Sequence, residues 1–123
     1  MIMIGLKGSN KKDITNFMET LPSQDIGGVI LYDEDLTSKD ISTKNIIDSY
    51  QLKEFTFFLQ SQFNTSLFIG IDQEGGEVNR LKNIGDYKDC ESWAEIGKIN
   101  EPLKTSSFAK RTAEALNLRF GCF

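Results

Sequence analysis

Three short apolar segments, each followed by polar residues and then a longer stretch, constrain the fold of this 123-residue chain more than any other feature. They occupy residues 1–6, 27–32 and 66–71, and they show no strict alternation of apolar with polar residues. Such continuous runs are typical of strands covered on both faces. Strands that alternate with helices predict right-handed crossovers and a parallel sheet. The sequence therefore predicts an α/β fold.

The intervening segments predict three helices. The first starts at Ser9 or Asn10 and ends before Pro22, the second covers residues 50–63, and the third runs from Glu101 to Leu118 with Pro102 in its first turn. We expect a long loop at 33–49 with a helical turn near 45–48, one or two turns at 91–99, and the approach to a fourth strand at 118–123. The expected buried faces are Ile14, Phe17, Met18 and Leu21; Leu52, Phe55, Leu59 and Phe63; and Phe108, Ala109, Thr112, Ala113 and Leu116.

The third apolar run ends abruptly at Asp72, which is followed by Gln73, Glu74 and the pair Gly75-Gly76. Ligands of α/β proteins bind at the carboxyl ends of parallel strands. Acidic groups at such an end, next to glycines that free the backbone to turn, therefore predict a binding site. A solvated Gly-Gly turn is the alternative that these residues leave open.

Composition excludes several classes of function. The net charge is -4 and the pI is near 4.8, which argues against a nucleic-acid partner. No apolar stretch reaches the length of a membrane span, and the start of the chain lacks the pattern of a signal peptide, so we expect a cytoplasmic protein. The chain has no histidine, which removes Ser-His and Cys-His nucleophiles. Cys90 and Cys122 lack metal spacing, and two free thiols or one disulfide both remain open.

The run I-D-Q-E-G-G-E-V-N-R-L at 71–81 resembles the signature that follows the third barrel strand in glycoside hydrolase family 3, in its β-N-acetylhexosaminidase branch. Glu77 departs from the family, which usually has arginine there. The strand G-V-I-L-Y is also similar to a family strand, but acidic residues starting at Asp33 replace the usual arginine-asparagine pair. The matching positions are Asp72, Gln73, Glu74, Gly75, Gly76, Val78 and Arg80.

The resemblance covers nearly all of residues 1–123 and implies an incomplete N-terminal domain of that family. We expect the N-terminal part of a (β/α)8 TIM barrel, with about three and a half βα units and parallel strands, and a truncated reading frame. The implied parent activity is hydrolysis of terminal β-linked N-acetylglucosamine or a related β-glycoside, without metal or organic cofactor. The family's nucleophilic aspartate and acid/base histidine belong to regions that this chain lacks, so we expect the chain alone to be inactive.

The resemblance also implies roles for three residues of the loop. Asp72 would accept hydrogen bonds from sugar hydroxyls, Arg80 would orient neighbouring carboxylates or hold the ligand, and Glu74 would help to position them. No residue is expected to be catalytic or to bind a metal. The expected partners are a β-glycoside such as an amino sugar, and either the missing barrel half or a second copy, because residues 29–31 and 69–71 would be exposed.

Other interpretations stay open at this point. The chain could be a non-catalytic carbohydrate-binding module, or a phosphate-binding α/β module that uses Gly75-Gly76 as a cradle. The complete glycine-rich phosphate motifs are missing, and the neighbouring carboxylates would repel a phosphate. Trp93 could stack on a sugar or simply pack the loop against the core. The four phenylalanines Phe55, Phe57, Phe58 and Phe63 are expected to belong to the core.

Overall fold

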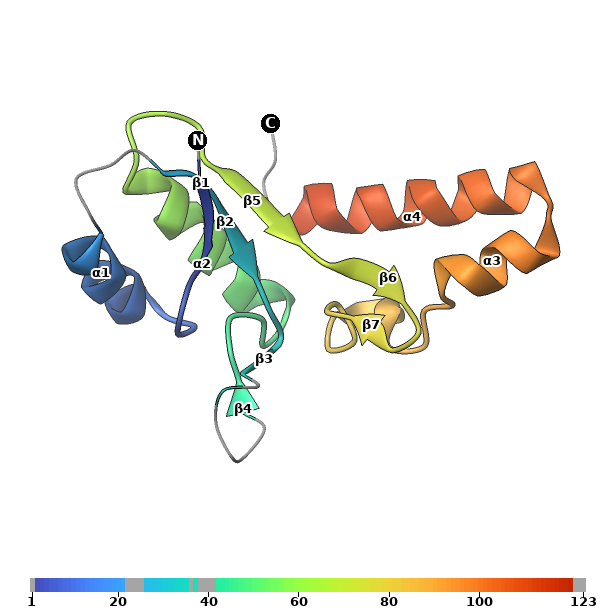
Figure 1. Cartoon of the computed structure of the whole chain (residues 1–123), viewed down its shortest axis with the longest axis horizontal. Coiled ribbons are helices and arrows are strands. Elements are labelled where there is room, and N and C mark those ends of the chain that lie inside the picture. The colour runs from blue at the N-terminus through green and yellow to red at the C-terminus, as the bar shows by residue number, and fades with distance from the viewer. Residues whose placement is uncertain (1, 22–25, 36, 38–41, 121–123) are drawn as a thin grey trace.

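The computed structural model describes residues 2–21, 26–35, 37 and 42–120, and this part of the chain is an α/β protein with a parallel three-stranded sheet and four α-helices (Figure 1). Two short hairpins and one 3-10 turn complete it. The elements are β1 Ile2–Gly5, α1 Lys11–Thr20, β2 Ile26–Leu31, β3 Glu34–Asp35, β4 Ser42–Thr43, α2 Ser49–Ser61, β5 Phe68–Ile71, β6 Gln73–Gly75, β7 Val78–Asn79, η1 Gly85–Tyr87, α3 Trp93–Ile99 and α4 Pro102–Phe120.

The sheet confirms the predicted parallel arrangement. Its strand order is β1-β2-β5, and Val29 in the central strand pairs with Ile4 on one side and Ile69 on the other. All three strands run in the same direction, so the loops after β1, β2 and β5 emerge at the same edge of the sheet.

The two faces of the sheet have different environments. Val29 and Leu31 are completely buried in the same core as Leu52 and Leu59 of α2, which lies behind the sheet in Figure 1. The expectation that residues 29–31 would be exposed is therefore wrong for Val29 and Leu31, whose side chains point towards the helices, while Ile30 on the other face is partly exposed. The large apolar side chains that the sheet exposes are instead those of Ile2, Met3 and Phe68, which are 54%, 50% and 64% exposed.

The starts of α1 and α4 follow the predicted signals, and α2 has an N-cap that was not predicted. Asn10 caps α1, where its side chain accepts a hydrogen bond from the Asp13 amide and the Asp13 carboxylate accepts one from the Asn10 amide. Asp48 caps α2 by accepting hydrogen bonds from the amides of Tyr50 and Gln51, both at 2.8 Å. Pro102 is the first residue of α4, as predicted.

The loop after β2 differs from the prediction. Residues 45–48 form no helical turn, and the short strands β3 and β4 pair as a hairpin instead. The amides of Lys44 and Asn45 donate to the carbonyls of Asp33 and Tyr32, at 2.9 and 2.8 Å. These bonds return the chain to the end of β2 and hold residues 44 and 45 beside it in an extended conformation.

The C-terminal helix is longer and its buried stripe narrower than predicted. It continues to Phe120, so residues 118–120 do not approach a fourth strand, and 121–123 lie outside the described residues. Ala109 and Ala113 are exposed, whereas Phe108, Thr112 and Ala115 are buried. Figure 1 shows the reason: α3 and α4 extend away from the sheet as an antiparallel pair, so much of α4 faces solvent.

Phe57 and Cys90, two residues considered in the sequence, differ in their burial. Phe57 lies on the outer face of α2 and is 76% exposed, so the expectation of an all-core phenylalanine group is wrong for this residue. Cys90 is a free, buried thiol, and Cys122 lies outside the described residues.

None of the helices within the described residues is both long and apolar enough to cross a membrane.

Candidate functional site

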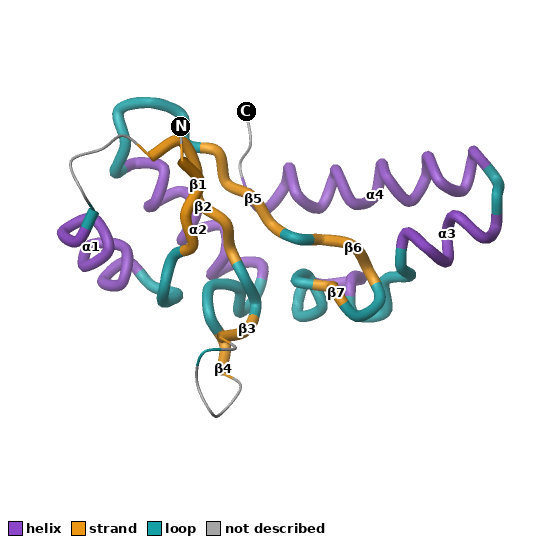
Figure 2. Tube along the Cα trace, in the orientation of Figure 1, coloured by secondary structure: helices purple, strands orange, loops and turns teal. Residues whose placement is uncertain are grey.

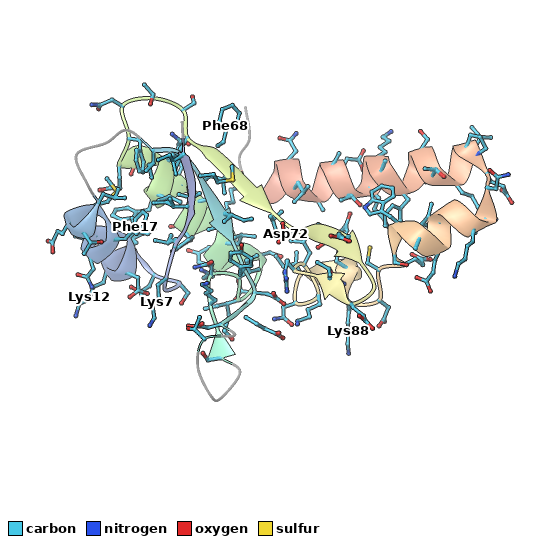
Figure 3. All side chains as sticks on the ribbon, viewed as in Figure 1. Lys7, Lys12, Phe17, Phe68, Asp72 and Lys88 are labelled. Atoms are coloured by element: carbon cyan, nitrogen blue, oxygen red, sulfur yellow. The ribbon has the colours of Figure 1, made fainter. Side chains whose placement is uncertain are left out.

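The candidate site lies at the carboxyl edge of the sheet, where the segments after β2 and β5 meet. Asp33 follows β2, and Asp72 is the single residue between β5 and β6 (Figure 2). Figure 3 shows Asp72 at this junction, before the chain turns into the β6–β7 hairpin. The parallel register therefore brings two acidic segments from distant parts of the sequence to one edge.

The glycine pair shapes the hairpin after Asp72. Gly75 and Gly76 have positive φ angles of 74° and 57°, which favour glycine. A Cβ on Gly75 would lie 2.0 Å from the carbonyl oxygen of Glu91, so this backbone packs directly against the segment before α3. The Gly76 amide donates to the Cys90 carbonyl at 2.8 Å. A phosphate cradle would need amides that point outward, and this one is already used inside the protein.

Two amide side chains hold the loop from inside. The Gln73 side chain accepts a hydrogen bond from the Leu81 amide at 3.1 Å and donates one to Asn79 Oδ1 at 3.0 Å. Asn79, which is buried, donates in turn to the carbonyls of Tyr87 and Lys88. Gln73 therefore has a structural role, and Asn79 is a supporting residue that sequence reasoning did not single out.

Among the ion pairs and hydrogen bonds of the described residues, none joins Arg80 to Asp72 or Glu74. The Nη1 of Arg80 lies 3.2 Å from Asp33 Oδ1, and its guanidinium carbon lies 5.8 Å from the centre of the Tyr32 ring. Asp72 and Glu74 are exposed and form no ion pair or side-chain hydrogen bond with other described residues. The structure thus places Asp72, Glu74 and Arg80 on one segment, 72–80, without an ion pair or hydrogen bond among their side chains.

Asp33 is the centre of a charged cluster, and sequence reasoning missed this role. Its side chain is 1% exposed, and Lys82 Nζ lies 2.8 Å from Asp33 Oδ2. Lys82 also pairs with Glu34 Oε1. Hydrogen bonds to Asp33 and then to Glu34 raise the pKa of Lys82, which keeps it charged. Asp33 and Glu34 follow an apolar strand just as Asp72 does, and that signal could have identified them.

Two buried side-chain atoms of the charged cluster have no hydrogen-bond partner among the described residues: Asp33 Oδ2, which is ion-paired with Lys82, and Arg80 Nε. Buried donors are normally paired, so an exception needs an explanation. Arg80 therefore has Nη1 bound to Asp33 and a buried Nε without a hydrogen-bond partner in this part of the chain.

Trp93 packs in the loop region and is not a flat platform over the site. Its ring meets Phe108 of α4 edge to face, with centroids 4.5 Å apart and an interplanar angle of 83°. This contact joins the start of α3 to α4, while Trp93 stays 38% exposed. The contact favours the interpretation that Trp93 packs the loop against the core.

Glu77, the residue that departs from the family pattern, is exposed at the tip of the β6–β7 hairpin.

The donor set for a metal is limited. Among the described residues, no group of three or more His, Cys, Asp and Glu side chains is placed to hold a metal ion. The Asp33 carboxylate is already neutralised by two cations. Hydrogen bonding and ionic attraction are therefore the interactions that this edge offers to a ligand.

No family model, no curated protein and no solved structure matches the chain.

Proposed function

We propose that this chain is the N-terminal part of a (β/α)8 barrel of the glycoside hydrolase family 3 type and contributes part of a β-glycoside-binding site. The parent activity would be hydrolysis of terminal β-linked N-acetylglucosamine residues. The observation that carries the proposal is the position of Asp72, which is exposed at the carboxyl end of β5 and begins the resembling D-Q-E-G-G run.

The local chemistry supports a sugar rather than a phosphate. Asp72 and Glu74 are exposed carboxylates that can accept hydrogen bonds from vicinal hydroxyls, while they would repel an anion. Arg80 is held at the same edge by Asp33, and its side chain is 20% exposed, so part of its guanidinium group could donate to an acceptor oxygen of the ligand. In this arrangement Asp33 replaces the neutral or basic residues of the family pattern and acts as the residue that positions Arg80.

The chain by itself should bind a sugar weakly and should not hydrolyse it. Glycoside hydrolysis needs an acid and a nucleophile or base on opposite sides of the bond. Asp72 and Glu74 belong to one continuous segment, so they cannot bracket a glycosidic bond from both sides. The chain has no histidine to act as the acid/base residue of the hexosaminidase branch.

Two measurements on the purified chain test the proposal. Saturation-transfer NMR with N-acetylglucosamine should detect binding that Asp72→Asn abolishes and that Glu77→Gln, a matched change on the same hairpin, preserves. A chromogenic β-N-acetylglucosaminide should give no turnover. Equal binding by both variants would contradict the sugar site. Turnover that disappears in Asp72→Ala would place the catalytic groups within this chain and overturn its assignment as a binding segment without catalytic residues.

A further inference from the structure

The face of the sheet that α2 does not cover carries Tyr32 and Asp72 at its carboxyl end. Leu31 of β2 pairs with Ile71 of β5, and Leu31 is completely buried in the core that includes α2. Tyr32 and Asp72 are the next residues of these two neighbouring strands, and successive side chains of a strand point to opposite faces. Tyr32 and Asp72 therefore leave the sheet side by side, on the face opposite to the core.

Contacts with three other segments fix the position of Tyr32. A Cβ on Gly5, at the end of the neighbouring strand β1, would lie 3.9 Å from Cε2 of the Tyr32 ring. Lys44 Nζ and the guanidinium carbon of Arg80 lie 4.8 and 5.8 Å from the centre of this ring. The Tyr32 amide donates to Asn45 Oδ1 at 2.9 Å, and the Tyr32 carbonyl accepts from the Asn45 amide at 2.8 Å. Both the backbone and the ring of Tyr32 are thus held in place.

The hydroxyl group of Tyr32 is unused. It forms no hydrogen bond within the described part of the chain, although the amide and the carbonyl of the same residue are both paired. Tyr32 is partly exposed, and its hydroxyl is not among the buried atoms that lack a partner, in contrast to the hydroxyl of Tyr87. Solvent therefore reaches the Tyr32 hydroxyl, which is available to a ligand on a side chain that is already ordered.

The proposed sugar site needs a hydrogen-bond donor of this kind. The ionised carboxylates of Asp72 and Glu74 can only accept hydrogen bonds. Hydroxyl groups of N-acetylglucosamine can donate to them, but its acetamido carbonyl can only accept. Arg80 is one donor at this edge, but Asp33 already binds its Nη1. The Tyr32 hydroxyl, which can donate, has no such competing partner in the described part of the chain.

We propose that Tyr32 is a specificity-determining residue, whose hydroxyl donates a hydrogen bond to the acetamido carbonyl of a sugar held by Asp72. The inference rests on the proposed function and deepens it, because it names the residue that selects an N-acetylated sugar over the sugar without the acetamido group. Glucose, which has a hydroxyl in place of that group, offers no carbonyl to the Tyr32 hydroxyl.

Tyr32→Phe tests the proposal, because it removes the hydroxyl and keeps the ring that Lys44 and Arg80 approach. We would titrate the full-length wild type and the variant with N-acetylglucosamine and with glucose and measure the affinities by NMR. Tyr32→Phe should weaken binding of N-acetylglucosamine at least about threefold, in line with the loss of one hydrogen bond, and should leave the affinity for glucose unchanged.

Tyr50→Phe is the matched control. Tyr50 lies in the first turn of α2 and is 78% exposed, so the loss of its hydroxyl should leave both affinities unchanged. An equal loss in Tyr50→Phe and Tyr32→Phe would overturn the role of Tyr32. Equal losses for the two sugars in Tyr32→Phe would overturn the assignment to the acetamido carbonyl.

The same titrations separate this inference from the proposed function. If Tyr32→Phe binds N-acetylglucosamine as tightly as the wild type while Asp72→Asn abolishes binding, the role of Tyr32 is wrong and the sugar site stands. A wild-type chain that binds neither sugar would overturn both.

Discussion

Asp33 and Lys82 form an ion pair across the carboxyl edge of the sheet, with Lys82 Nζ 2.8 Å from Asp33 Oδ2. Arg80 approaches the other oxygen of the same carboxylate at 3.2 Å. Solvent hardly reaches Asp33, whose side chain is 1% exposed, so these two cations compensate its charge in place of water. The pair joins the loop after β2 to the segment after β7 and thereby fixes the hairpin that begins after Asp72.

Asp33→Asn should destabilise the protein by about 2 kcal/mol, because it leaves Arg80 and Lys82 without their shared counter-charge. The midpoint and slope of urea unfolding would measure the change. Asp72→Asn removes the same charge from an exposed carboxylate without a partner among the described residues, and it should shift stability by less than about 0.5 kcal/mol. Equal effects of the two variants would contradict the clamping role of Asp33.

Asn45→Ala should cost about 3 kcal/mol of unfolding free energy. The completely buried Asn45 side chain donates to the carbonyls of Leu6 and Gly8, at 3.0 and 2.7 Å, and accepts from the Tyr32 amide at 2.9 Å. Alanine would leave these three backbone groups without the partner that joins β1 to β2. Denaturant unfolding checks the value, and a loss below about 1 kcal/mol would show that water replaces the side chain.

Gly75→Ala should destabilise the protein by at least about 2 kcal/mol, since it combines a positive φ with an overlap on the Glu91 carbonyl. Gly97→Ala provides the opposite control. Gly97 lies within α3, and a Cβ there would meet no atom within 4 Å, so alanine should stabilise the helix by roughly 0.5–1 kcal/mol. Thermal unfolding of both variants measures the difference, and similar melting temperatures would contradict the packing of the hairpin.

The start of α3 should loosen in acid. Hydrogen bonds from the Ser92 amide and then from its hydroxyl lower the pKa of Glu95 from its ordinary value of 4.5. A lowered pKa in the folded state means that this stabilisation is present above pH 4.5 and is lost as pH falls through the pKa of the folded state. The Ser92 amide shift should report the transition, which Glu95→Gln should remove and Glu19→Gln should leave intact.

The open face of the sheet should promote self-association. Met3 and Phe68 lie on either side of Gly28 in one cross-strand row, and both are at least half exposed. Phe68→Ser should reduce association in sedimentation velocity measured over a range of concentrations. Phe57→Ser, on the outer face of α2, is the matched control and should have a smaller effect. A wild-type chain that stays monomeric with a concentration-independent melting temperature would contradict the prediction.

Local chemistry explains why several features could be read from the sequence. The continuous apolar runs predicted three strands, and Asn10 and Pro102 predicted two helix starts, because strand burial and helix capping depend on residues close together in the chain. Asp72 stood out for the same reason, since it directly ends an apolar run. The faces of α4 and the exposure of Phe57 were predicted less well, because they depend on where neighbouring elements end.

The sequence by itself determined the alternation of strands and helices, the direction of the sheet and the turn that needs Gly75 and Gly76. Only the tertiary structure decided that Asp33 would bind Arg80 and Lys82, and that Asn45 would bridge the ends of β1 and β2. Contacts of this kind join residues from separate loops. Their geometry depends on strand register and on how each loop folds back, and neither is encoded in the spacing of the residues that meet.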